Sequence, residues 1–219
     1  MLSPDPNSPL RRFERSMVID YRKWHDGVGY DLDAIREASH DERQAIEILL
    51  FNRGTRDWRD VEALAALDTA GARAALRQAK HSRDHGVTMA VAHYAPDVLS
   101  DDERTAVIVR ALNSAQFYEG LSEALDQAEV HHPPAVIDAL LRGTIERDGD
   151  VAVHFAALVL YFHGKADSSF DMAQRPFFLT FNTPDRDERM RAFRELCRKA
   201  GLDPEPYVRR LAVGEKERR

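Results

Sequence analysis

The sequence is poor in cysteine, which limits how the chain can be held together. Cys197 is the only cysteine among the 219 residues, so no disulfide bond can form within one chain. Structural disulfides are typical of oxidising compartments, and their absence favours a reducing one such as the cytoplasm. Cys197 stands in the helical pattern RAFRELCRKAG. We expect it to be a small buried apolar residue there rather than a reactive thiol.

Long apolar runs are also missing. The stretch VAVHFAALVLYF at Val151–Phe162 is interrupted only by His154, but spanning a bilayer takes about 18 consecutive apolar residues. This stretch predicts instead a helix packed on several sides, with His154 as a core or half-buried histidine that has one hydrogen-bond partner. The N-terminus has no apolar core of signal-peptide length, and we expect residues 1–16 to form a flexible leader.

The chain has neither a surplus of positive charge nor a catalytic motif. Its net charge is -6, whereas domains that bind duplex nucleic acid usually carry a basic surplus. No G-x-S-x-G nucleophile elbow and no glycine-rich phosphate loop is present. The sequence DGVGY at 26–30 offers a single Gly-x-Gly, which does not support a nucleotide site. We therefore expect no cofactor and no enzymatic activity.

Strand signals are absent, and a helical repeat is present. No segment alternates apolar and polar residues between hairpin turns. Small or apolar residues instead recur every 33 residues at i, i+4, i+5 and i+8, which form one stripe of a helix. These positions are Val87, Val91, Ala92 and Ala95, then Gly120, Ala124, Leu125 and Ala128, then Val153, Ala157, Leu158 and Tyr161. A second stripe at 107–112 and 140–145 has the same offset, so the pattern indicates repeating pairs of helices.

Helix end signals complete this prediction of an all-α fold. Ser39 with Glu42 has capping-box spacing, and so has Ser100 with Glu103. Gly54 is expected to end one helix, and Gly201 to close another at Asp185–Ala200. A shorter helix pair is expected at 59–67 and 71–80. We predict one domain over 17–205, with repeats at about 56–164, an irregular C-terminal cap at about 165–203, and a loose tail at 206–219.

The segment DWRDVEALAALDTAGARAALRQAKHSRDHGVTMAVAHYAP resembles the short HEAT-like repeats of bacterial proteins related to phycobilin lyases. The resemblance covers Arg56–Gly164. It implies an α-solenoid of helical hairpins with N- and C-terminal caps and a binding surface, and it fixes no reaction. The flanks KWHDGVGYDLDAI and FDMAQRPFFLTFNT resemble a group of uncharacterised bacterial HEAT-repeat proteins linked to immunity proteins.

Histidine and arginine patterns leave two weaker alternatives open. His81 and His85 are four residues apart, but a helix boundary is expected between them, and we predict no metal site. Some HEAT-like solenoids are DNA glycosylases with a basic face, and the expected second helices carry several arginines: Arg73, Arg77, Arg104, Arg110, Arg142 and Arg147. Acidic residues share these segments, and a mixed face of this kind favours simple solvation.

The helix FYEGLSEALDQAEV, at 117–130, has the clearest charge asymmetry. Four acidic residues and one tyrosine lie on it without any lysine or arginine: Tyr118, Glu119, Glu123, Asp126 and Glu129. Their spacing keeps the four acids near one helix face. One interpretation is a solvated acidic face. The other is an acidic patch that attracts a basic partner.

The aromatic residues Trp24, Trp58, Phe177 and Phe178 favour core or capping roles, with an exposed anchor on a partner surface as the alternative. The function we expect is non-catalytic protein binding by a cytoplasmic bacterial immunity or adaptor protein, whose acidic helix captures a basic partner such as a toxin. The alternative is a HEAT-like enzyme, similar to a DNA glycosylase or a lyase, that acts on nucleic acid or a prosthetic group.

Overall fold

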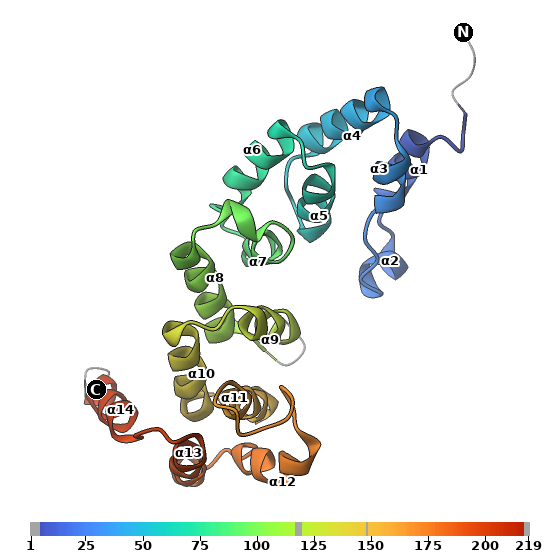
Figure 1. The fold of residues 1–219 in the computed structure, drawn as a ribbon. Helices are drawn as coiled ribbons and strands as arrows, with labels where there is room; N and C mark the ends of the chain where they lie inside the picture. Colours follow the sequence, from blue (N-terminus) through green and yellow to red (C-terminus); the bar gives the residue numbers. More distant parts are fainter. Residues whose placement is uncertain (1–4, 117–119, 148, 217–219) are drawn as a thin grey trace. The chain divides into compact units, whose positions relative to one another are not determined.

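The structure is a computed structural model that describes residues 5–116, 120–147 and 149–216, with side chains up to residue 210. Over these residues the fold is all-helical, as the sequence predicts, without any β-strand (Figure 1). One isolated bridge joins Gln116 and Gly120. The chain forms two compact units, residues 1–104 and 105–219, and each is described by itself. The division falls within α8 (Asp101–Ser114).

The first unit is organised around α5 (Trp58–Leu67), which contacts α3, α4, α6 and α7. The other elements are α1 (Pro9–Ser16), α2 (Tyr21–His25), α3 (Leu32–Glu37), α4 (His40–Arg53), α6 (Ala70–Ala79), α7 (His85–Tyr94) and the 3₁₀ turn η1 (Pro96–Val98). The pair α5 and α6 matches the predicted helices at 59–67 and 71–80. The capping box of Ser39 with Glu42 and the helix end at Gly54 are confirmed.

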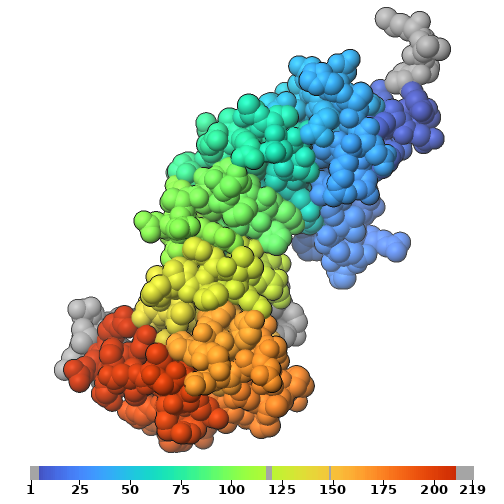
Figure 2. Space-filling model, viewed as in Figure 1, coloured from blue at the N-terminus to red at the C-terminus, as the bar shows by residue number. Residues whose placement is uncertain are grey.

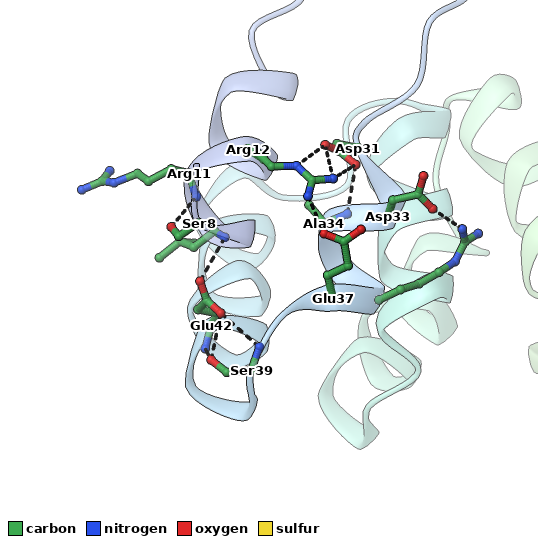
Figure 3. Close-up of polar contacts among 11 residues, drawn as sticks. Ser8, Arg11, Arg12, Asp31, Asp33, Ala34, Glu37, Ser39 and Glu42 are labelled. Atoms are coloured by element: carbon green, nitrogen blue, oxygen red, sulfur yellow. Dashed lines mark hydrogen bonds and ion pairs between the residues drawn. The ribbon is translucent and has the colours of Figure 1, made fainter. Parts of the chain in front are cut away.

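Residues 9–16 are helical, which corrects the prediction of a flexible leader over 1–16. Ser8 caps α1, and Pro9 occupies its first turn, where the missing N–H costs nothing. Phe13 is fully buried, and its ring meets that of Tyr30 edge-on at 5.7 Å. The guanidinium of Arg12 pairs with Asp31 and Glu37 on the neighbouring segment (Figure 3). Packing and ion pairs that are distant in sequence therefore hold α1 in place.

A buried carboxylate, Asp60, connects three segments of the first unit. Its Oδ1 accepts hydrogen bonds from Arg53 Nε at 2.8 Å and from the Tyr30 hydroxyl at 3.0 Å. Its Oδ2 accepts the backbone N–H groups of Arg56 at 2.9 Å and Asp57 at 3.2 Å. Burial, followed by the nearby Asp60 charge, raises the pKa of Tyr30. The network fixes α4, α5 and the segment before α3 together.

The second unit is built on α10 (Pro134–Glu146) and α11 (Gly149–Phe162), which pack along each other. Its other elements are α9 (Leu121–Val130), η2 (Met172–Gln174), α12 (Arg175–Phe178), η3 (Leu179–Phe181), α13 (Arg186–Ala200) and α14 (Glu205–Lys216). Most of the apolar run at 151–162 is buried on α11, and this explains why it is apolar around nearly its whole circumference.

Gly143 lets α10 and α11 approach closely. A Cβ at this position would lie 2.4 Å from Cδ2 and 2.5 Å from Cε2 of Phe155, whose ring is buried. Contacts that short do not occur between carbon atoms at rest, because attraction is greatest at about 3.5–4.0 Å. The glycine is therefore required by the neighbouring ring rather than by its own backbone conformation.

The C-terminal segments partly follow the predictions. The irregular cap expected at 165–203 corresponds to η2, α12 and η3, and both α12 and η3 contact α11. Helix α13 ends at Gly201, which has a left-handed conformation with φ of 76°, as predicted. Cys197 is buried, and this burial raises the pKa of its thiol to about 12.

Residues 205–216 form α14 rather than a loose tail, and Arg210 Nη2 bonds to Asp138 Oδ1 at 2.9 Å.

Candidate functional site

A cleft of about 150 Å³ opens on the second unit beside the acidic helix α9. Three segments form it, namely α9, α11 and residues 169–170 from the stretch that follows α11. The lining residues are Ser122, Leu125, Asp126, Glu129, His154, Leu158, Ser169 and Phe170. The cleft therefore combines two carboxylates and two hydroxyls with an imidazole, a phenyl ring and two leucines.

The predicted acidic face divides into three parts. Asp126 and Glu129 line the cleft, whereas Glu123 is exposed on the same helix and is not among the lining residues. Tyr118 and Glu119 lie outside the described residues. Within the part of the chain that the structure describes, Glu123, Asp126 and Glu129 form no ion pair, unlike Asp138 on α10, which pairs with Arg142 and Arg210. The three carboxylates therefore create a negative potential at the surface, and no ion pair with a described residue neutralises it.

Two rings, one from α11 and one from the stretch after it, meet in the lining of the cleft. His154 on α11 is half-buried, in agreement with the prediction for this residue, and its ring lies 4.9 Å from that of Phe170 with a tilt of 44°. Burial lowers the pKa of His154 below its ordinary value of 6.5, although the charge of Asp150, one turn earlier, opposes the shift. At neutral pH the imidazole is thus uncharged, and the two carboxylates dominate the charge of the cleft.

This lowered pKa predicts a pH-dependent stability. A histidine with a folded-state pKa below its unfolded value binds fewer protons when folded, so its contribution to stability is lost as pH falls from about 6.5 through the folded value. We expect the free energy of unfolding of the wild type, relative to His154→Gln, to decrease between pH 7 and pH 5. Urea unfolding followed by circular dichroism at several pH values measures this difference. A difference that stays constant over that range contradicts the prediction.

Exposed aromatic and aliphatic residues gather around α2 in the first unit. Trp24 is 64% exposed and Tyr21 77% exposed, and their rings lie 6.1 Å apart. Val18 and Val28 flank them and are also exposed. Figure 2 shows the blue segment that contains α2 projecting from the surface of this unit. The favoured prediction of a core or capping role holds for buried Phe178 and half-buried Trp58 and Phe177, but it is wrong for Trp24.

Glu62 is a half-buried carboxyl group on α5 and lies beside Tyr94 and Gly29. Burial raises the pKa of Glu62, and the hydrogen bond from the Tyr94 side chain opposes this shift. A Cβ at Gly29 would approach Glu62 Oε2 to 2.9 Å. Perturbed carboxyls occur at catalytic sites but equally in structural contacts. Here the group lies between α5, Tyr94 of α7 and the segment at Gly29, and we assign it a packing role.

Two of the arginines considered for a nucleic-acid surface have partners within the protein, and the two histidines considered for a metal site lie in different segments. Arg73 bonds to Asp68 and Asp97, and Arg147 donates to the carbonyl oxygens of Asn113 and Ala115. His81 lies between α6 and α7, so it shares no helix face with His85. Across residues 5–116, 120–147 and 149–216, no group of three or more histidine, cysteine or acidic residues is placed to hold a metal ion.

Of the helices in the described residues, none combines the length and the apolar character needed to cross a membrane. Comparisons with family models, with curated proteins and with solved structures find no match to this chain.

Proposed function

We propose that the chain is a non-catalytic protein-binding module that captures a basic partner through the acidic face of α9. The observation that carries this proposal is the cleft beside α9, where Asp126 and Glu129 line a solvent-open space and no lysine or arginine stands among the described lining residues. Like charges on one helix face repel each other and cost a few tenths of a kcal/mol per pair. A basic partner removes this repulsion and is attracted from a distance.

The repeat interpretation is part of the same proposal. The positions at 87–92, 121–128 and 153–161 fall in α7, α9 and α11, and those at 107–112 and 140–145 fall in α8 and α10. Ala95 is the residue that follows α7. Gly120, which occupies position i in the second copy of the repeated stripe, is the residue before α9 and has φ of 73°. Helix pairs in these registers support a HEAT-like solenoid with caps at both ends. A cytoplasmic bacterial immunity or adaptor protein that binds a toxin is the concrete form that we favour.

The proposal predicts that reversing the charges of this face abolishes capture. A tagged triple variant, Glu123→Lys/Asp126→Lys/Glu129→Lys, is compared with the wild type as bait for basic proteins at low and high salt. Wild-type capture should weaken as salt rises, because exposed charges are screened within about 10 Å at 0.1 M. The variant should capture none of the basic proteins that the wild type retains in a salt-sensitive manner.

A matched control separates this local effect from the change in net charge. The triple variant Asp102→Lys/Glu146→Lys/Asp187→Lys changes three exposed acids elsewhere and shifts the net charge by the same amount. It should retain capture. If both triple variants lose capture equally, or neither does, the acidic face of α9 is not the binding surface.

A further inference from the structure

We propose that the cleft beside α9 receives one arginine side chain of the basic partner, with the guanidinium group facing Asp126 and Glu129. This inference rests on the proposed function and adds the chemical class of the group that is recognised. Asp126 and Glu129 are one turn apart on α9, and both line the cleft. Two carboxylates that share one small space favour a single cation between them more strongly than either carboxylate does alone.

The size of the cleft agrees with such a group. A cavity of 150 Å³ is large enough for a ligand of about six non-hydrogen atoms, such as benzene. The cleft has this volume and opens to solvent, so a side chain can enter from outside while its main chain stays on the surface. The arginine side chain beyond Cβ is of the same size, whereas a lysine side chain is smaller and leaves part of the space to water.

The aromatic wall favours arginine over lysine. The rings of Phe170 and His154 lie together in the lining of the cleft, and Leu125 and Leu158 complete the apolar lining. A guanidinium group is planar and weakly hydrated, stacks on ring faces, and forms paired hydrogen bonds with carboxylates. An ammonium group is compact and strongly hydrated, and so loses more of its hydration in a cleft with apolar walls. The combination of rings and carboxylates is therefore specific for arginine.

Titration of the full chain with N-acetyl-arginine methylamide, followed by ¹H–¹⁵N NMR, tests this inference. Saturable shifts should occur at residues 122–129, 154–158 and 169–170. The citrulline analogue, which has nearly the same shape without the charge, should bind at least about tenfold more weakly, because it lacks the charge-assisted hydrogen bonds. The lysine analogue should fall between the two. Equal affinity for arginine and citrulline analogues, or no saturable shift in these residues, overturns the inference.

Two variants make the test specific to the cleft. Asp126→Asn/Glu129→Gln should weaken binding of the arginine analogue at least about tenfold, whereas Glu123→Gln, on the same helix but outside the cleft, should leave it within about twofold. Equal weakening by both variants contradicts a local site. The arginine site can fail while the proposed function stands: if Asp126→Asn/Glu129→Gln still captures the basic partner and the triple lysine variant does not, the acidic face is confirmed and the arginine site is refuted.

Discussion

Asp60→Asn is expected to lower the free energy of unfolding of the first unit by about 3 kcal/mol. Removing one member of a buried ion pair typically costs 3–5 kcal/mol, because the other charge is left without compensation. The low end of this range applies, since the Arg53 side chain remains 29% exposed and keeps part of its hydration. Asparagine keeps only one acceptor oxygen, so the variant loses either the bonds from Arg53 and Tyr30 or the bonds from the two backbone N–H groups.

Urea unfolding followed by tryptophan fluorescence measures this effect in the correct unit, because both tryptophans, Trp24 and Trp58, belong to the first unit. Asp68→Asn is the matched control, since Asp68 forms an exposed ion pair with Arg73 at 2.6 Å. Exposed pairs contribute less than about 1 kcal/mol, and asparagine tolerates the left-handed conformation of this residue. Equal effects of the two substitutions contradict the structural role assigned to Asp60.

Gly143→Ala is expected to destabilise the second unit by a net of about 1–2 kcal/mol, although helix propensity alone predicts the opposite sign. Alanine is favoured over glycine within a helix by about 1 kcal/mol. The new methyl group, however, would lie 2.4 Å from the buried Phe155 ring, and overpacking of a filled core typically costs 1–3 kcal/mol or more. The separation is so short that α10 and α11 must move apart, and we expect the steric cost to prevail.

A double-mutant cycle with Phe155→Leu tests the cause of this effect by circular dichroism. If the clash with the ring is responsible, Gly143→Ala should cost less in the Phe155→Leu background than in the wild type, because the smaller side chain gives way. Stabilisation by Gly143→Ala in the wild type, or the same cost in both backgrounds, contradicts the close contact between α10 and α11.

Helices and their ends could be predicted from the sequence because their determinants are local. The capping box of Ser39 with Glu42 and the left-handed glycine at Gly201 each depend on residues within one turn. The local signal for α1 was also present, since Ser8 followed by Pro9 is typical of a helix start. The proline- and serine-rich composition of the N-terminus nevertheless favours a leader, and the burial of Phe13 depends on a contact with Tyr30 that is distant in sequence.

The candidate site could be predicted only in part, since its walls come from distant segments. Charge spacing on one helix identifies Asp126 and Glu129 as neighbours. The lining also contains Phe170, which lies in the irregular stretch after α11, and no helical periodicity predicts where that stretch returns. The exposure of Trp24 is similarly non-local, because it depends on whether another element covers the short helix α2.

The central claim is that the basic partner binds on the second unit at α9. Hydrogen–deuterium exchange of the full chain, with and without the captured basic partner, tests it most directly. The account predicts slower exchange in residues 120–130 and 149–171 on binding. Unchanged exchange in these residues, with protection confined to residues 17–31 around the exposed aromatic residues of α2, would contradict it.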